Sequence, residues 1–138
     1  MILVDTSVWI DFFDHRDSPY ANELVRLIKE DEELCLADMN VVEILQGIKE
    51  ERVFEEIKGY LMQFPILRVR SLETYIRAAH IYRLCRKIGK TITKTMDAII
   101  AAIALENNFR VFHRDKDFDL IADCTKLKIY SFDDNTQP

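Results

Sequence analysis

Short apolar runs, rich in β-branched residues, alternate along the chain with longer stretches in which apolar residues are spaced as in a helix. Three runs are typical of buried strands: Ile2–Val4, Leu34–Ala37 and Phe64–Val69. Two further short strands are expected at Arg110–Phe112 and Lys128–Tyr130. The segments between these strands predict helices over residues 8–13, 19–28, 39–48, 50–62, 72–88 and 96–105.

Helix start signals support this assignment. Ser18 precedes Pro19 in the order typical of an N-cap and a first helical turn. Asp38, Ser71 and Thr95 are the expected N-caps of three later helices. Strands that alternate with helices predict an α/β fold of three layers, with helices on both faces of a mainly parallel sheet of about five strands. A length of 138 residues fits one domain, so we expect residues 1–138 to fold as a single unit.

Composition excludes several classes of protein. Apolar residues make up 49% and charged residues 31% of the chain, which is typical of a globular domain and not of a disordered one. The longest apolar run, Ala98–Leu105, has 8 residues, far fewer than the roughly 20 that cross a bilayer. The N-terminal run Met1–Val4 is too short for a secretory signal, so the expected location is the cytoplasm.

The three cysteines and three histidines are scattered along the chain. Cys35, Cys85 and Cys124 lack the spacing of a metal knuckle and are odd in number, which favours reduced thiols over a disulfide framework. The histidines are equally dispersed, so a zinc site is not expected.

Acidic residues follow the predicted strands. Asp5 comes directly after the first strand, Asp115 and Asp117 follow the strand Arg110–Phe112, and Asp97 lies in the first turn of a buried helix. Open parallel sheets bind ligands beyond the carboxyl ends of their strands, so these carboxylates are expected to converge there. Several like charges in one small volume call for a cation, and oxygen ligands suit a hard divalent ion.

Each of these acids also has a purely structural interpretation. Asp5 is placed to cap the following helix, and Asp97 to interact with a helix dipole. Asp115 and Asp117 are typical turn residues. Glu43 lies off the apolar stripe of its helix, where a solvated Glu is ordinary. Aromatic residues at helical spacing after the first strand are expected in the core rather than stacked on bases: Trp9, Phe12 and Phe13.

Four segments together resemble one known family in order, spacing and length. They are Ile2–Ser7 (ILVDTS), Val42–Gly47 (VEILQG), Thr95–Ala101 (TMDAIIA) and Val111–Phe118 (VFHRDKDF). The chain resembles the PIN-domain endoribonucleases and, within them, the VapC-type toxins of toxin–antitoxin pairs. His113 departs from the family pattern, in which this position is more often Thr or Ser.

The resemblance implies a metal-dependent hydrolysis of RNA phosphodiester bonds by an activated water, with Mg²⁺ or Mn²⁺ as the cofactor. It implies that Asp5, Asp97 and Asp115 bind the metal. Glu43 and Asp117 would complete the catalytic acidic cluster, holding metal-bound waters or a second ion. Thr6 and Ser7 are expected mainly as capping hydroxyls. The resemblance also implies a cognate antitoxin and a homodimer.

A basic stretch precedes Asp97. Residues 68–94 carry eight basic side chains and one acidic side chain in a protein whose net charge is -5. Such a stretch is either a solvated helix face or a contact for an RNA backbone. The candidates for that contact are Arg83, Arg86, Lys87, Lys90 and Lys94.

Other classes fit the residues less well. The first strand lacks the second Asp of a phosphoaspartyl transferase, because Ser7 stands there, and Trp9 replaces the second Ser of a metal-dependent adhesion motif. The glycine-rich segment of a P-loop is absent, because Leu84 stands where that motif needs a Gly before Gly89-Lys90-Thr91. The remaining alternative is a catalytically inactive PIN-like module that binds RNA or a protein partner.

Overall fold

The computed structural model describes residues 1–133. Its strands are β1 (Ile2–Val4), β2 (Leu34–Ala37), β3 (Ile66–Leu67), β4 (Arg110–Phe112) and β5 (Lys128–Ile129). Its helices are α1 (Thr6–Phe13), α2 (Pro19–Lys29), α3 (Asp38–Leu45), α4 (Glu51–Leu61), α5 (Leu72–Lys87), α6 (Thr95–Asn107) and α7 (Lys116–Cys124).

The five strands form one sheet in the order β3-β2-β1-β4-β5, and every neighbouring pair is parallel. The chain therefore builds the sheet outward from β1 on one side, then returns to place β4 and β5 on the other side of β1. This arrangement makes the β1–β4 boundary the point where the strand order reverses. Ligands of open α/β sheets bind at that point.

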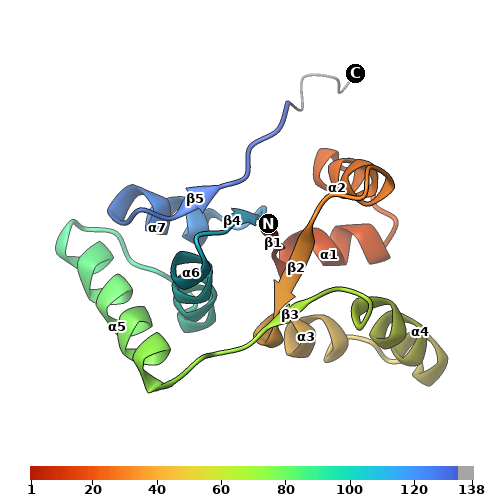
Figure 1. Cartoon of the computed structure of the whole chain (residues 1–138), viewed down its shortest axis with the longest axis horizontal. Coiled ribbons are helices and arrows are strands. Elements are labelled where there is room, and N and C mark those ends of the chain that lie inside the picture. Colours follow the sequence, from red (N-terminus) through yellow and green to blue (C-terminus); the bar gives the residue numbers. More distant parts are fainter. Residues whose placement is uncertain (134–138) are drawn as a thin grey trace.

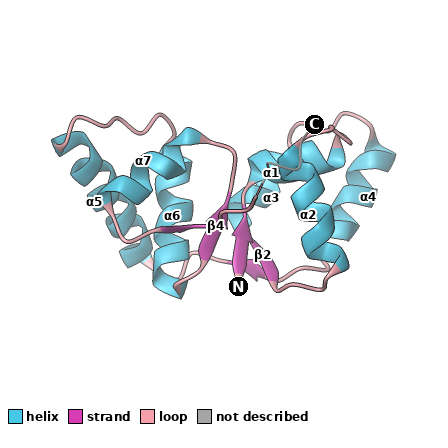
Figure 2. Ribbon diagram, turned by 90° about the horizontal axis from the view of Figure 1, so that it is seen from above, coloured by secondary structure: helices cyan, strands magenta, loops and turns pink. Residues whose placement is uncertain are grey.

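Helices cover both faces of the sheet, as Figures 1 and 2 show: α5, α6 and α7 lie on one side and α1 to α4 on the other. Alternate strand residues supply the two cores. Leu3 and Val111 pack with α5, α6 and α7, whereas Ile2, Val4 and Phe112 pack with the opposite helices. A strand buried on both faces needs apolar side chains at every position, which explains the unbroken apolar runs. The predicted three-layer α/β/α fold is confirmed.

The structure differs from the sequence-based prediction in several helix starts and in one helix. Asp38 is the first residue of α3, whose N-cap is Ala37, and Thr95 is the first residue of α6, whose N-cap is Lys94. The helix α7 was absent from the prediction, which assigned the residues after β4 to turns. Only Phe118 and Ile121 are buried apolar side chains in α7, so its apolar periodicity is short and weak.

The aromatic residues that follow β1 belong to the core, as predicted. Trp9 is fully buried, and its indole Nε1 donates to the carbonyl oxygen of Val4 at 3.1 Å. Its ring lies 5.7 Å from that of Phe13 and 5.2 Å from that of Phe64, measured between ring centroids. This cluster anchors α1 beneath the strand that delivers Asp5.

The three cysteines are free thiols, as predicted, and all lie in the part of the chain that the structure describes. Burial raises the pKa of Cys35 to about 12, so this thiol stays protonated at neutral pH. Within residues 1–133, none of the helices combines the length and the apolar character that a membrane span requires.

Candidate metal centre

Two adjacent strands deliver acidic residues to the same edge of the sheet. Asp5 follows β1 directly, and its backbone N–H donates to the carbonyl oxygen of Phe112, the last residue of β4, at 2.9 Å. Asp115 follows β4 after two further residues and caps α7. Because β1 and β4 are parallel neighbours, their carboxyl ends meet where the strand order reverses.

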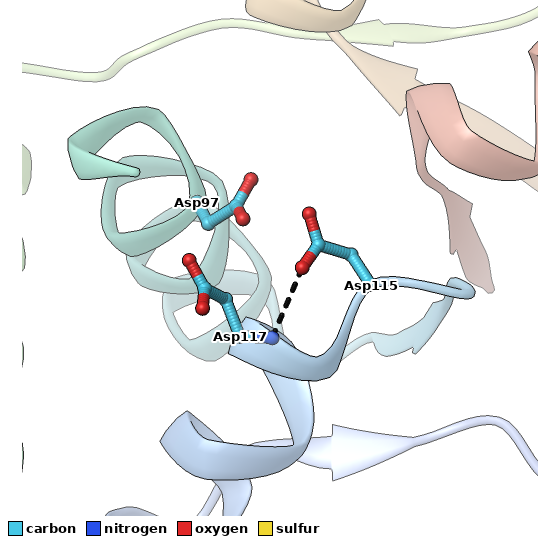
Figure 3. Close-up of side chains that lie close together, drawn as sticks. All are labelled: Asp97, Asp115 and Asp117. Atoms are coloured by element: carbon cyan, nitrogen blue, oxygen red, sulfur yellow. Dashed lines mark hydrogen bonds between the residues drawn. The ribbon is translucent and has the colours of Figure 1, made fainter. Parts of the chain in front are cut away.

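Three carboxylates form a compact group at this edge, which we call the acidic group: Asp97, Asp115 and Asp117. Each contributes one oxygen atom, and these oxygens lie within 4.8 Å of one another. Figure 3 shows Asp97 projecting from α6 toward Asp115 and Asp117, which come from the start of α7. Asp97 and Asp117 lie in the first turns of their helices, where the helix dipole favours negative charge.

Hydrogen bonds orient Asp117 but leave one of its oxygens unused. Its Oδ2 accepts from the backbone N–H of Thr93 at 3.0 Å, the hydroxyl of Thr93 at 2.8 Å and the backbone N–H of Lys94 at 3.0 Å. Its Oδ1 and the Oδ2 of Asp97 are buried without a hydrogen-bond partner within residues 1–133. A buried polar atom without a hydrogen-bond or ionic partner destabilises the fold, so these two carboxylate oxygens are suited to binding a cation.

Asp5 lies beside the acidic group but is not a member of it. Among the described residues, the only group of three whose carboxylate oxygens lie within 4.8 Å of one another is Asp97, Asp115 and Asp117. Its Oδ2 accepts from the backbone N–H of Ser7 at 3.1 Å and from the hydroxyl of Ser7 at 2.7 Å. The side-chain amide of Asn40 donates to its Oδ1 at 3.3 Å. Asp5 is thus the N-cap of α1, and the expectation that Thr6 or Ser7 caps this helix is wrong. Capping still leaves Asp5 close enough to raise the pKa of Asp97.

Glu43 is tied to Asp5 through a short chain of hydrogen bonds. The hydroxyl of Thr6 donates to Oε1 of Glu43 at 2.8 Å, and the amide of Asn40 donates to the same hydroxyl at 3.0 Å. Helical periodicity alone had placed Glu43 on a solvated face, whereas its half-buried side chain points to the Asp5 side of the site. The hydrogen bond between Thr6 on α1 and Glu43 on α3 accounts for this difference, because the apolar stripe of α3 carries no information about contacts with another helix.

Asn40 is the site residue that sequence reasoning missed. Its side chain is fully buried, and its Oδ1 accepts from the backbone N–H of Ala37 at 2.9 Å while its amide reaches Asp5 and Thr6. The available signal was its position at the start of a helix directly after β2, where Asn is a common capping residue.

The pKa values of the carboxylates in the acidic group shift in opposite directions. Burial, followed by the negative charges of Asp115 and Asp5, raises the pKa of Asp97 to about 8. Burial also acts on Asp115, but the Lys94 ammonium, whose Nζ lies 2.7 Å from Oδ2, and the hydrogen bond from the backbone N–H of Asp117 act against it, and the pKa of Asp115 is lowered. Without a metal, Asp97 therefore retains a proton at neutral pH while Asp115 is ionised.

His113 supports the loop that carries Asp115. Its Nδ1 accepts from the backbone N–H of Asp115 at 2.9 Å, so the ring proton lies on Nε2, which faces Oδ1 of Asp119 at 3.1 Å. A Thr or Ser at this position would be too short to make both contacts. The departure from the family pattern thus has a local structural role.

The five basic candidates lie in different surroundings. Lys94 contacts the acidic group directly, and Lys90 pairs with Asp123 on α7 at 2.8 Å. The other three lie on α5 and line pockets that include no member of the acidic group: Arg83, Arg86 and Lys87.

The raised pKa values predict how the metal-free protein responds to pH. Asp97 has an ordinary pKa of 3.8 in the unfolded chain and about 8 in the folded protein, so the folded state binds more protons between those values. Asp5 and Glu43 act in the same direction, because burial raises their pKa values. The free energy of unfolding should therefore decrease as the pH rises from about 5 to about 8.

Urea unfolding in chelator at the two pH values measures this effect. The lowered pKa of Asp115 acts only below its ordinary value of 3.8, outside the window. Asp97→Asn should markedly reduce the dependence of the free energy of unfolding on pH. A wild-type protein that becomes more stable toward pH 8 in chelator would contradict the assigned charge states.

Comparisons with known proteins match this chain to one family. A family model described as "PIN domain" matches residues 2–123. The chain is 35% identical over 133 residues to the VapC ribonuclease Mb1587 of Mycobacterium bovis, covering 96% of this chain and 99% of that protein.

Solved structures share the fold. VapBC2 from Rickettsia felis, bound to a DNA fragment from its promoter, matches with a TM-score of 0.74 at 19% identity, covering 96% of this chain and 100% of the other. A toxin–antitoxin complex from Klebsiella pneumoniae matches with a TM-score of 0.67 at 21% identity, covering 84% and 88%.

Proposed function

Because the chain belongs to the PIN-domain family, we propose that it is a metal-dependent endoribonuclease, the toxin of a toxin–antitoxin pair, that hydrolyses RNA phosphodiester bonds. Its relatives named VapC ribonucleases align with it over nearly their whole length, which supports an activity carried by residues 1–138 as one nuclease domain. The alternative of an inactive binding module predicts no cleavage.

One observation carries the proposal. Two buried carboxylate oxygens, Oδ2 of Asp97 and Oδ1 of Asp117, lack hydrogen-bond partners among the described residues, and both residues belong with Asp115 to the acidic group at the ligand-binding edge of the sheet. Their hard oxygen atoms suit Mg²⁺ or Mn²⁺ rather than a softer transition metal. We assign Asp5, Asp97 and Asp115 as metal ligands, and Asp117 and Glu43 as further members of the catalytic cluster, which would hold metal-bound waters or a second ion.

When bound, such an ion supplies Lewis-acid activation of a water and neutralises charge on the phosphate. The chain's own residues prepare the site. Ser7 and Asn40 orient Asp5, the hydroxyl of Thr6 orients Glu43, and the loop at Thr93 holds Asp117. Lys94 offsets part of the negative charge at Asp115.

Partners and location follow from the family. We propose RNA as the substrate, an antitoxin protein as a regulatory partner and a homodimer as the toxin's own assembly. The toxin–antitoxin complexes among proteins of the same fold support the antitoxin. The three free cysteines are compatible with the reducing cytoplasm, which is the location we propose.

The decisive experiment incubates the purified chain with a panel of single-stranded and structured RNAs. We expect endonucleolytic fragments with Mg²⁺ or Mn²⁺ and none when a chelator is added. An Asp123→Asn variant, which changes an exposed carboxylate on α7, serves as the matched control for charge. Intact RNA in every arm with a folded protein would overturn the nuclease assignment and favour the inactive module.

Metal binding also predicts a change in stability. An ion that binds only the folded protein stabilises it by about 2.7 kcal/mol at 100 times its dissociation constant. We expect Mg²⁺ or Mn²⁺ to raise the melting temperature at pH 7, and the gain to grow with pH because binding displaces the proton on Asp97. Differential scanning fluorimetry with matched ionic strength measures the gain. An equal gain in Asp97→Asn would place the ion elsewhere.

A further inference from the structure

Two pockets share a wall formed by Arg114 and Lys116, and one of them adjoins the acidic group. The first, which we call the cationic pocket, has a volume of about 420 Å³ and includes Asp115 of the acidic group in its lining. The second, which we call the aromatic pocket, has a volume of about 340 Å³. A strand of RNA that occupied both would pass next to the acidic group.

The cationic pocket carries net positive charge in an acidic protein. Four cationic side chains line it against two carboxylates, those of Asp11 and Asp115. The cations are Arg16, Lys94, Arg114 and Lys116. Lys116 is exposed and forms no ion pair within the described chain, and Arg16 is 55% exposed, so both are available to an anion from solvent.

Buried Asp11 fixes the arginines of this pocket. Its side chain is 2% exposed, and its Oδ2 accepts from Nη1 of Arg114 at 2.5 Å and from the hydroxyl of Ser18 at 2.9 Å. Nη1 of Arg16 lies 3.6 Å from Oδ1 of Asp11. The guanidinium of Arg114 also lies over the ring of Tyr20, 5.7 Å from its centroid. Cations held in place before binding lose little conformational entropy when they meet a phosphate.

The aromatic pocket offers ring faces together with polar edges. Tyr130 and Phe132 are stacked with an interplanar angle of 18°, and Tyr20 meets Phe132 edge-on with 5.5 Å between ring centroids. The carboxylate of Asp119, which is 66% exposed, and the side chain of Ser131 lie in the same lining. Unpaired nucleobases stack on such rings, and carboxylate and hydroxyl oxygens accept from base amino groups.

We propose that these pockets form one substrate subsite, in which the aromatic pocket holds an unpaired nucleobase of the RNA and the cationic pocket holds the adjoining backbone phosphates. The inference rests on the proposed ribonuclease function and names the path of its substrate. Asp11 acts in it as a positioning residue for Arg114. The basic residues of α5 have no part in this path, because their pockets share no lining residue with the cationic pocket, whereas the aromatic pocket shares Arg114 and Lys116 with it.

The test measures binding separately from cleavage. Fluorescence anisotropy with a labelled single-stranded RNA of mixed sequence is performed in an Asp97→Asn background, over a range of salt concentrations with Mg²⁺ present. Arg16→Gln/Lys116→Gln removes two exposed charges while Arg114 and Ser18 still satisfy Asp11. Substituting Arg114 itself would leave Asp11 buried without its closest cation, so it is not the chosen variant. The matched control is Arg83→Gln/Arg86→Gln on α5.

We expect the Arg16/Lys116 variant to weaken binding roughly tenfold and to lower the slope of log Kd against log salt by about 1.4, because each single-strand phosphate contact contributes about 0.7. Phe132→Leu should weaken binding by roughly tenfold without changing the slope, because a stacked base contributes about 1–3 kcal/mol independent of charge. The α5 control should stay within about twofold of the parent.

Two results would overturn the subsite: loss of affinity in the α5 control with none in Arg16/Lys116, or unchanged affinity in Phe132→Leu with its fold intact. Failure of the nuclease assignment gives a different pattern. In that case the wild-type chain binds RNA through these residues and cleaves none.

Discussion

Asp97→Asn is expected to reduce RNA cleavage by roughly 10³-fold, equivalent to about 4 kcal/mol of transition-state stabilisation. Asp97 is 2% exposed, has one oxygen without a hydrogen-bond partner within residues 1–133, and lies in the first turn of α6 close to Asp115 and Asp117. An amide of nearly the same shape removes the charge that binds the ion but preserves the packing. Initial rates of cleavage at saturating Mg²⁺ measure the effect.

The structural consequences of Asp97→Asn separate a lost ligand from a damaged fold. Removing one of several crowded carboxylates relieves repulsion, so the metal-free variant should be at least as stable as the wild type at about pH 8. Stabilisation by Mg²⁺ should disappear. Asp123→Asn, an exposed change of the same type, should retain full activity. Cleavage that persists in Asp97→Asn and remains sensitive to chelator would show that Asp97 is not a ligand.

Trp9→Ala is expected to lower the free energy of unfolding by about 3–5 kcal/mol. Trp9 is fully buried among Phe12, Phe13, Tyr60 and Phe64, and truncation leaves a cavity that these rings cannot close without losing their contacts. The change also removes the hydrogen bond from Nε1 to the carbonyl oxygen of Val4, which contributes about 1 kcal/mol.

Denaturant unfolding followed by circular dichroism measures this loss. Ile10→Ala is the matched control, because Ile10 is the next residue of α1 and is 36% exposed. Its truncation should lower the free energy of unfolding by well under about 1 kcal/mol, as is typical of a surface change. Trp9 is hydrogen-bonded to Val4, the residue before Asp5. Loss of this contact should loosen the backbone that positions Asp5, so the variant should also lose part of its stabilisation by metal. If Trp9→Ala kept wild-type stability but bound RNA more weakly, the assignment of Trp9 to the core would be contradicted, and Trp9 would belong to the binding surface.

Much of the fold could be read from local patterns. The apolar runs at Ile2–Val4 and Leu34–Ala37 match β1 and β2, because both faces of a parallel strand are buried. The run Phe64–Val69 predicted a longer strand than β3, which pairs with β2 only over Ile66 and Leu67. The helix α7 escaped prediction because its few buried residues make the period weak.

The candidate site was less predictable than the fold. Helical periodicity placed Glu43 on a solvated face, and only its hydrogen bond from Thr6, 37 residues earlier in the chain, brings it to the site. Lys94 was expected to contact RNA, whereas it first neutralises Asp115. Asn40 carried no chemical signal that distinguished it from an ordinary helix cap. Each of these contacts joins residues from different elements, and no spacing along one element encodes them.

The sequence by itself determined which acids exist and where each sits on its own element, because capping, burial and strand patterns depend on near neighbours. Only the tertiary structure decided that Asp97, Asp115 and Asp117 share one small volume while Asp5 lies beside them. The pairing of β1 with β4 across more than one hundred residues brings these elements to one edge. Burial, followed by the charges of Asp115 and Asp5, raises the pKa of Asp97, and electrostatic coupling falls off with distance. The raised pKa and the affinity for a divalent ion therefore arise only once the chain has folded.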